Sequence, residues 1–421
     1  MPTPRPIRAT YLIETAFPLE QATEMMAGEQ SSGTFVKTPG ETDELKEKHA
    51  AHIEGIEVVG ETNQPSLPKA RVPKGVTNPT YQQAKVTLSW PLENVGVNLS
   101  NLMATVAGNL FELAPFSALK LLEITVPADY QKAYPGTQFG TAGTRELIGM
   151  DDRPIIGTII KPSVGLSPEQ TARQVETLIE AGLDFIKDDE LMGDSPHSPF
   201  EQRVDAVMKV INRYADRHGK KSMFAFNLSG DIDDMLRRHD YVLKQGGTCV
   251  MVSLNWVGIS GVAKLRQHCQ LPIHGHRNGW GLYSRSEAIG LDFPVYQTIF
   301  SLAGADHIHT NGIRNKFCET DESVLRSIKS CLNPTGGGYP VTPVISSGQW
   351  AEQAHDTYQA MQSADLMYLC GGGITGHPGG LAAGVRSIQL GWEGAMKGQT
   401  IYDLQDQHPE IQQAIELYGN K

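Results

Sequence analysis

The strongest constraint on the fold is a regular alternation of short apolar runs and helical stretches, which begins near residue 153. Eight runs have the length of strands: 154–161, 184–189, 222–227, 249–254, 271–276, 306–309, 341–346 and 365–370. The stretches predicted as helices include 168–181, 200–217, 232–245 and 260–269. Eight strand–helix units over about 250 residues are typical of an α/β fold of the (β/α)₈ TIM-barrel type. A doubly wound open sheet is the alternative.

The first third of the chain is less regular. Residues 84–90 alternate as a strand does, 102–122 indicate at least one helix, and 60–78 have the Pro, Asn, Gly and Thr content of surface loops. A length of 421 residues also favours two domains. We therefore predict a small α+β domain over 1–127 and the barrel over 128–421.

Charge and composition narrow the classes of partner. The formal net charge is −11 and no dense Lys/Arg block occurs, which argues against nucleic-acid or anionic-membrane binding. No run of apolar residues is long enough to cross a bilayer, and none is visible over 1–19, so we expect a soluble cytoplasmic protein without a signal peptide. An odd number of cysteines without paired spacing argues against a disulfide framework or a zinc site: Cys249, Cys269, Cys318, Cys331 and Cys370.

Polar, ionisable or glycine residues close seven of the eight predicted strands. In a (β/α)₈ barrel the carboxyl ends of the strands carry the active site. The residues at these ends are Lys161, the run Lys187-Asp188-Asp189-Glu190, Asn227, the run His274-Gly275-His276-Arg277, the run His307-Ile308-His309, the run Ser346-Ser347-Gly348, and Gly371-Gly372-Gly373.

The run that begins at Lys187 is the most informative of these. Side chains alternate along a strand, so Lys187 and Asp189 face one way, and Glu190 can turn in where the strand ends. Two carboxylates are suitable ligands for Mg²⁺, and a lysine amine that took up CO₂ would supply a third anionic oxygen donor. The alternative is a solvated charged turn with an ordinary salt bridge.

The glycine-containing ends of the last two strands suit phosphate binding, because backbone N–H groups can approach an anion closely there. Two ordinary tight turns are the alternative. Arg277 and Lys316 are cationic candidates for a second anionic group. A histidine on an apolar strand is more often a core residue, but the repeated His-x-His places one ring of each pair inward.

These motifs resemble the large subunit of ribulose-bisphosphate carboxylase/oxygenase (RuBisCO) over nearly the whole chain. The matching segments are Gly157-Thr-Ile-Ile-Lys161-Pro, Gly182-Leu-Asp-Phe-Ile-Lys187-Asp-Asp-Glu190, His274-Gly-His276-Arg277, Asp306-His-Ile-His309 and Cys370-Gly-Gly-Gly373-x-x-Gly-His-Pro. In the first third they are Glu29-Gln-Ser-Ser-Gly-Thr34-Phe35, Trp90-Pro-Leu and Ala107-Gly-Asn109.

The resemblance implies a ferredoxin-like α+β domain before the barrel, and a homodimer whose active sites lie between one subunit's barrel and the other's N-terminal domain. It implies Mg²⁺ on a carbamylated Lys187 (N6-carboxylysine), Asp189 and Glu190. Lys161 would be an acid/base and His276 a polar active-site group. One end of a phosphorylated substrate would be held by Arg277, His309 and Ser346, and the other by Thr34, Gly348, Gly371 and Gly372. Lys316 matches the lysine of the mobile sixth loop, and Glu29 and Asn109 match positions that reach in from the second subunit.

The chain also departs from the carboxylases. Ser163 stands where they have the second lysine of Lys-Pro-Lys, and Thr310-Asn311-Gly312 stands where they have Ser-Gly-Thr. Phe35 replaces a tryptophan, and Ser347 replaces the first glycine of a pair. These changes indicate a RuBisCO-like protein, which keeps metal-assisted enolisation and does not fix CO₂.

Several RuBisCO-like activities are possible. The 2,3-diketo-5-methylthiopentyl-1-phosphate enolase carries a lysine base at the position of Asn109, which weighs against that reaction. We favour decarboxylation of 3-oxo-isoapionate 4-phosphate to L-erythrulose 1-phosphate, in apiose catabolism, because a leaving CO₂ generates the enolate without a base. The alternatives are the transcarboxylase/hydrolase reaction on the same compound, the enolase, a methylthioribulose-phosphate isomerase, and an inert regulatory barrel without activity.

Overall fold

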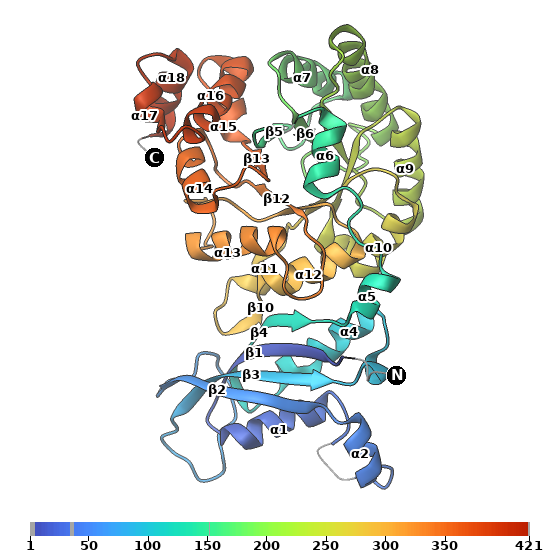
Figure 1. Ribbon diagram of the computed structural model, residues 1–421, viewed down its shortest axis with the longest axis vertical. Helices are drawn as coiled ribbons and strands as arrows, with labels where there is room; N and C mark the ends of the chain where they lie inside the picture. Colours follow the sequence, from blue (N-terminus) through green and yellow to red (C-terminus); the bar gives the residue numbers. More distant parts are fainter. Residues whose placement is uncertain (1–4, 34–37, 151, 420–421) are drawn as a thin grey trace. The chain divides into compact units, whose positions relative to one another are not determined.

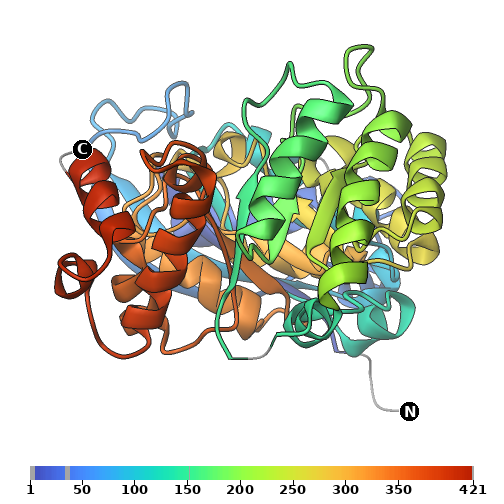
Figure 2. The same cartoon turned by 90° about the horizontal axis from the view of Figure 1, so that it is seen from above.

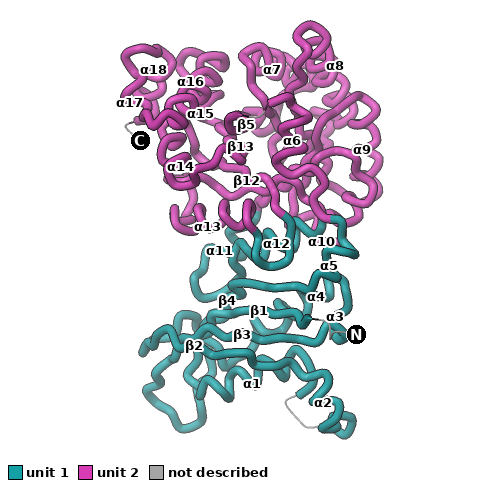
Figure 3. Tube along the Cα trace, viewed as in Figure 1, with its two compact units in different colours: residues 1–135, 279–303, 334–339 teal, residues 136–278, 304–333, 340–421 magenta. Residues whose placement is uncertain are grey.

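The protein is described by a computed structural model that covers residues 5–33, 38–150 and 152–419 (Figure 1). The chain divides into two compact units, which are considered one at a time (Figure 3). Unit 1 comprises residues 1–135, 279–303 and 334–339, and unit 2 comprises 136–278, 304–333 and 340–421. The boundary between 127 and 128 in the sequence stays a prediction.

In unit 2, the described residues form a closed barrel of eight parallel strands, which confirms the predicted (β/α)₈ fold and excludes the open sheet. The strands pair in the order β11-β12-β13-β5-β6-β7-β8-β9. Their bounds are β5 Ile155–Ile159, β6 Phe185–Lys187, β7 Met223–Asn227, β8 Cys249–Ser253, β9 Ile273–His276, β11 His307–His309, β12 Thr342–Ile345 and β13 Met367–Leu369.

The barrel strands are apolar on both faces, as parallel strands covered by helices must be. Sequences such as Met-Phe-Ala-Phe-Asn in β7 and Cys-Val-Met-Val-Ser in β8 are buried at every position. Side chains from several strands form one cluster, which includes Phe185, Met223, Met251, Val344 and Leu369. The barrel is therefore a packed core, and its polar groups appear where the strands end.

Helices follow the barrel strands and surround them (Figure 2). Ser167 caps α7 in a reciprocal capping box with Gln170, and Pro168 is the first residue of that helix. Helix α10 begins at Leu254, six residues earlier than predicted, and is interrupted at Gly258, where φ is +77°. The helices of unit 2 are α6 Gly140–Ile148, α7 Pro168–Glu180, α8 Phe200–His218, α9 Ile232–Lys244, α10 Leu254–His268, α13 Asp321–Leu332, α14 Gln353–Met361, α15 Gly372–Thr375, α16 Gly380–Ala395, α17 Ile401–Leu404 and α18 Pro409–Tyr418.

Unit 1 contains a mixed sheet in the order β10-β4-β1-β3-β2, which agrees with the expected α+β domain. Its strands are β1 Ile7–Thr15, β2 His52–Thr62, β3 Tyr81–Trp90, β4 Phe116–Thr125 and β10 Ile289–Leu291. Strand β1 pairs antiparallel with β3 and β4, and β10 adds to β4 in parallel. The helices are α1 Leu19–Glu29, α2 Asp43–His49, α3 Leu92–Val95, α4 Leu99–Val106, the 3₁₀ helix η1 Asn109–Glu112, α5 Ala128–Ala133, α11 Gly281–Ser284 and α12 Phe293–Ala303.

One prediction for this unit is wrong in its second half. At least one helix was expected within 102–122, and the end of α4 lies there, but α4 ends at Val106, η1 at Glu112, and β4 begins at Phe116. The apolar run in β4 pairs with β1 and is buried, so tertiary pairing decides the structure of a segment that periodicity alone leaves ambiguous.

None of the helices in the described residues combines the length and apolar character needed to span a bilayer.

Candidate active site

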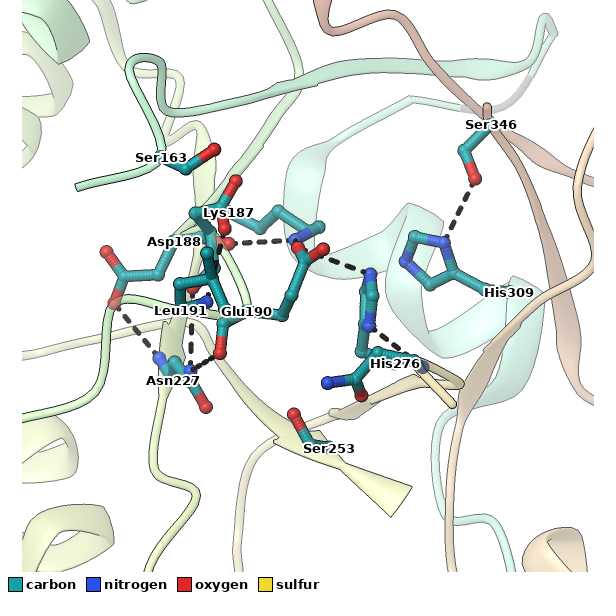
Figure 4. Close-up of polar contacts among 12 residues, drawn as sticks. Ser163, Lys187, Asp188, Glu190, Leu191, Asn227, Ser253, His276, His309 and Ser346 are labelled. Atoms are coloured by element: carbon teal, nitrogen blue, oxygen red, sulfur yellow. Dashed lines mark hydrogen bonds and ion pairs between the residues drawn. The ribbon is translucent and has the colours of Figure 1, made fainter. Parts of the chain in front are cut away.

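Lys187 is the last residue of β6, and its side chain is fully buried at the end of the barrel. Its Nζ donates to the carbonyl oxygen of Asp188 at 2.8 Å and lies 3.7 Å from Oε2 of Glu190 (Figure 4). Burial lowers the pKa of the Lys187 ammonium, and the attraction of Glu190 and Asp189 offsets this only in part. The neutral amine, which is the form that can take up CO₂, therefore forms more readily at Lys187 than at a solvated lysine.

Asp189 lies beside Lys161, which follows β5. Nζ of Lys161 lies 2.6 Å from Oδ2 of Asp189 and donates to Oγ of Ser163 at 2.9 Å. Asp189 is buried, whereas the Lys161 side chain is 38% exposed. The Lys161 ammonium thus contacts a buried carboxylate, while part of the Lys161 side chain stays open to solvent and to a bound molecule.

Asp188 points the other way, as strand alternation predicts. It forms a fully buried ion pair with Arg203, whose Nε lies 3.2 Å from Oδ1, and accepts from the backbone N–H of Asn227 at 3.0 Å. Arg203, on α8, was not predicted from the sequence. It anchors the segment from which the neighbouring acidic side chains project, and only a three-dimensional structure identifies it as the partner of Asp188.

The residues at the end of β6 fit Mg²⁺. Asp189 and Glu190 provide hard carboxylate oxygens on adjacent residues, which is the ligand type that Mg²⁺ prefers. An unmodified Lys187 has no oxygen to offer, so a third protein ligand at this place requires its carbamate. A carbamate on Lys187 would complete the donor set, and burial of this lysine favours the neutral amine from which a carbamate forms.

His276 at the end of β9 faces the same acidic group. Its Nε2 lies 3.5 Å from Oε2 of Glu190, and its Nδ1 accepts from the backbone N–H of Asn278 at 3.2 Å (Figure 4). Burial, reinforced by Lys187, lowers the pKa of His276 to about 4 although Glu190 opposes the shift. Burial alone would raise the pKa of Glu190, but His276 and Lys187 outweigh it and the pKa lies below its usual value. His276 is therefore neutral near pH 7, with Nε2–H directed toward Glu190.

A row of hydrogen-bonded groups crosses the barrel from its mouth. Oγ of Ser346 lies 3.1 Å from Nδ1 of His309 (Figure 4). Nε2 of His309 lies 2.8 Å from Nε2 of His274. The row continues 3.3 Å to His307 and then 2.7 Å to Thr144. The hydroxyl of Thr144 donates to the carbonyl of Gly140, so its oxygen accepts from Nε2 of His307. Each neutral ring then accepts on one nitrogen and donates from the other, and the hydroxyl of Ser346 is the first donor of the row. Burial keeps the pKa of His274 and of His309 well below the usual value, in accord with three neutral rings.

The glycine loops after β12 and β13 lie beside two of the predicted lysines, Lys316 and Lys161 respectively. A Cβ placed on Gly371 would lie 3.9 Å from Cε of Lys161, so this loop passes beside the Lys161 side chain. Gly348 has φ of +89°, a conformation that favours glycine. Gly371 precedes the single helical turn α15, which begins at Gly372. The structure thus places Gly371, one of the residues predicted to hold a phosphate, beside the lysine predicted for acid/base chemistry.

Two protein-family models match this sequence, and both describe the ribulose bisphosphate carboxylase large chain. The model of the N-terminal domain of that chain matches residues 2–130, and the model of its catalytic domain matches residues 140–418. The chain belongs to the ribulose bisphosphate carboxylase large-chain family.

Similar members of this family have related names. A 3-oxo-isoapionate-4-phosphate transcarboxylase/hydrolase from Xanthobacter autotrophicus is 49% identical over 411 residues, 97% of this chain and 98% of the relative. A 3-oxo-isoapionate-4-phosphate decarboxylase from Rhizobium rhizogenes is 41% identical over 418 residues, 98% of this chain and 99% of the relative. The crystal structure of a RuBisCO-like protein from Burkholderia fungorum has a TM-score of 0.90 at 41% identity, and covers 98% of this chain and 100% of that one.

The remaining predicted residues of this RuBisCO-family chain are distributed over both units. Glu29 and Asn109 are in unit 1, where Nδ2 of Asn109 donates to Oε1 of Glu29 at 3.3 Å. Thr34 lies outside the described residues. In unit 2, Lys316 is exposed; its backbone N–H donates to the carbonyl of Ser347 at 3.2 Å, and its Nζ lies 5.2 Å from the centre of the Phe317 ring.

A second group of ligand-type side chains lies on the outer helices. Within the described ranges, His239, Asp240 and His268 present atoms that are all within 4.8 Å of one another. Nε2 of His239 accepts from the backbone N–H of Gln270, so in the neutral ring Nδ1 carries the proton and donates to Asp240. His268 contacts the same carboxylate oxygen at 2.6 Å. These hydrogen bonds satisfy the three side chains without a metal ion and link α9 to the end of α10, so we interpret the group as a structural contact between the two helices.

Acid is expected to destabilise the barrel through its buried histidines. Burial lowers the pKa of His307 to about 4, below the ordinary 6.5 that it regains on unfolding. The unfolded chain therefore binds more protons as the pH falls through this range, and the stability present above pH 6.5 is progressively lost toward pH 4. Between pH 7 and pH 5, protonation of His307 in the unfolded chain should lower the free energy of unfolding by about 2 kcal/mol. Urea unfolding at pH 7 and at pH 5 measures this difference in the free energy of unfolding.

The matched variants for this measurement are His307→Gln and His52→Gln. Glutamine cannot titrate, so His307→Gln should show a smaller loss between pH 7 and pH 5 than the unsubstituted protein. His52 is exposed on β2, and its replacement should leave the loss unchanged. An equal loss in His307→Gln and in the unsubstituted protein would contradict the expected titration.

Proposed function

We propose that this protein is a Mg²⁺-dependent enzyme that acts on 3-oxo-isoapionate 4-phosphate, a phosphorylated β-keto sugar acid. The observation that carries the proposal is the group at the ends of β5, β6 and β9, where Lys161, Asp189 and Glu190 meet the buried Lys187 and the neutral His276. The names of relatives at 41–49% identity support the choice of substrate.

The chemistry of the substrate suits this group. Its carboxylate is attached to the carbon next to a ketone, so loss of the carboxyl group leaves an electron pair that the ketone can accept as an enolate. When bound to Asp189, Glu190 and carbamylated Lys187, Mg²⁺ would polarise the ketone and stabilise the negative charge that develops there. His276 is uncharged and places an N–H donor toward Glu190, which fixes the orientation of that carboxylate.

Lys161 is the proposed proton carrier. Its Nζ contacts Asp189 and Ser163, and part of the side chain is exposed, so the ammonium can present a proton to a carbon of the bound substrate. The proton on Nζ passes to the carbanionic carbon, and solvent replaces it. The loop at Gly371 passes beside the same side chain, which puts the proposed phosphate position next to the proton donor.

We further propose transcarboxylation followed by hydrolysis as the complete reaction, because the relative with that name has the higher identity, 49% against 41%. The carboxyl group moves from its original carbon to the former ketone carbon, and water then cleaves the bond between the two carbons. The products are 3-phosphoglycerate and glycolate, which together contain the atoms of the substrate and one water.

Simple decarboxylation, the reaction favoured by the sequence, is the second candidate. It is supported by the relative from Rhizobium rhizogenes and by the position of Lys161, which can protonate the enolate to give L-erythrulose 1-phosphate. The enolase reaction has less support because Asn109 stands in place of its lysine base.

A panel of substrates tests the proposal. Purified protein, preincubated with Mg²⁺ and bicarbonate, should convert 3-oxo-isoapionate 4-phosphate and should not incorporate labelled CO₂ into phosphoglycerate from ribulose 1,5-bisphosphate. Ser163 in place of the second lysine is the reason for the second expectation. Carboxylation of the bisphosphate, or rapid enolisation of the diketo thiopentyl phosphate without turnover of the sugar acid, would overturn the proposal. Failure to bind Mg²⁺ in a titration would favour an inert barrel.

We propose a homodimer with shared sites as the active unit, since Glu29, Thr34 and Asn109 match residues that complete a neighbouring subunit's site. Mixing inactive Asn109→Ala and inactive Lys187→Ala proteins should restore roughly a quarter of the original activity, because half of random dimers are hybrids with one intact site of two. Native mass spectrometry verifies that hybrids form. Hybrids without restored activity would mean that each site is built within one chain.

A further inference from the structure

Arg277, which the resemblance assigns to one end of a phosphorylated substrate, contacts a carboxylate that the sequence did not predict as part of the site. A guanidinium nitrogen of Arg277 lies 2.8 Å from Oε2 of Glu319, and both side chains are largely buried, at 5% and 12% exposed. Arg277 is the residue expected to hold a second anionic group. Here its charge is balanced by an acidic side chain from the loop after β11.

Glu319 is held firmly in this position. Oε2 also accepts from Nδ2 of Asn311 at 2.6 Å, and Oε1 accepts from Oγ of Ser323 at 2.9 Å. Asn311 is in turn fixed, because its Oδ1 accepts from Oγ of Ser347 at 2.7 Å. Asn311 and Ser347 both have positive φ, +63° and +74°, where asparagine is tolerated better than most residues.

Asn311 and Ser347 are two of the positions at which the chain departs from the carboxylase pattern. Their side chains contact each other, and Asn311 contacts Glu319. The two departures therefore act together, and their joint effect is to hold a carboxylate against Arg277.

His309, which is predicted to hold the same end of the substrate, adds no positive charge, and the side chain of Lys316, in the same loop as Glu319, is exposed. His309 is buried and neutral, and its Nδ1 accepts a hydrogen bond from the hydroxyl group of Ser346. A phosphate dianion placed here would meet the Glu319 carboxylate and would have to break its ion pair with Arg277, at a large electrostatic cost in a buried site. An uncharged hydroxymethyl group would meet no such repulsion.

We propose that Glu319 makes this end of the site a neutral subsite, so that the enzyme selects substrates with a single phosphate, bound at the glycine loops, and a hydroxymethyl group at the Arg277 end. The inference rests on the proposed function for the identity of the substrate, which carries one phosphate and one hydroxymethyl group. The carboxylases act on a bisphosphate, and the difference in substrate is thereby assigned to one acidic side chain and the residues that hold it.

Equilibrium binding tests this without catalysis. Calorimetric titration of the full chain uses erythritol 4-phosphate and ribitol 1,5-bisphosphate, polyols that lack a carbonyl group and cannot react. The unsubstituted protein should bind the monophosphate at least about tenfold more tightly than the bisphosphate, and Glu319→Gln should tighten the bisphosphate at least about tenfold. The affinity of Glu319→Gln for the monophosphate should change less than about threefold.

Two further variants complete the design. Glu322→Gln removes an exposed charge from the start of α13 and should leave both affinities unchanged. Asn311→Gly removes one of the donors to Glu319 at a position where glycine adopts the observed φ without strain, and should tighten the bisphosphate by a smaller factor. An unchanged ratio of affinities in both Glu319→Gln and Asn311→Gly would overturn the proposal. Absence of turnover of 3-oxo-isoapionate 4-phosphate would count against the proposed function alone, because these titrations do not depend on it.

Discussion

Lys187→Ala is expected to lower turnover of 3-oxo-isoapionate 4-phosphate by at least about a thousandfold. Lys187 is the only side chain at the end of β6 that can be converted into a third oxygen ligand beside Asp189 and Glu190. Without the proposed carbamate, Asp189 and Glu190 would hold Mg²⁺ more weakly, and the negative charge of the enolate would be stabilised less. Steady-state assays after preincubation with Mg²⁺ and bicarbonate measure the loss.

The controls separate loss of the ligand from loss of the fold. Lys187→Met nearly preserves the volume of the fully buried side chain and should be as inactive as Lys187→Ala. Lys209→Ala, on the exposed face of α8, should retain full activity. A ¹³C NMR signal from a protein carbamate should form with labelled bicarbonate in the unsubstituted protein and be missing in Lys187→Met. Activity of Lys187→Met within tenfold of the original would refute the assigned role.

Lys161→Met is expected to lower kcat by about 10²–10⁴-fold, the range typical of a lost general acid. Nζ of Lys161 contacts both Asp189 and Ser163, so the variant also removes a cation from beside a predicted metal ligand. The measurement must therefore distinguish proton transfer from simple charge balance.

Lys161→Arg makes that distinction. Arginine keeps a cation beside Asp189 but cannot give up a proton near neutral pH, so this variant should be nearly as inactive as Lys161→Met. Ser163→Ala removes only the hydroxyl that Lys161 contacts and should cost less than about tenfold. If Lys161→Arg restored most of the activity, Lys161 would be an electrostatic partner of Asp189 and another group would carry the proton.

Much of the barrel and the position of its site could be predicted from the sequence. Parallel strands that are buried on both faces read as short apolar runs, and the polar residues that end such runs must gather at one end of a closed barrel. Lys187, Asp189 and Lys161 lie together for that reason. Local patterns were sufficient because each of these residues is placed by its own strand.

Residues whose positions depend on tertiary contacts could not be predicted. Phe116–Thr125 is a strand because it pairs with β1, and its apolar run alone is compatible with a buried helix. Arg203 reaches Asp188 from a helix, and Glu319 reaches Arg277 from a loop after a different strand. No short-range pattern links residues that are 15 or 42 positions apart in the sequence.

The carboxyl carbon of the substrate provides the most direct test of the central claim, which is that this site removes the carboxyl group of a phosphorylated β-keto sugar acid and transfers it. 3-Oxo-isoapionate 4-phosphate labelled with ¹³C in its carboxyl group is incubated with the protein, Mg²⁺ and bicarbonate, and the products are followed by ¹³C NMR. Label in bicarbonate beside L-erythrulose 1-phosphate would indicate the second candidate, decarboxylation. Transcarboxylation and hydrolysis predict label in the carboxyl group of 3-phosphoglycerate and none in glycolate, whereas label that stays in unchanged substrate would contradict the claim.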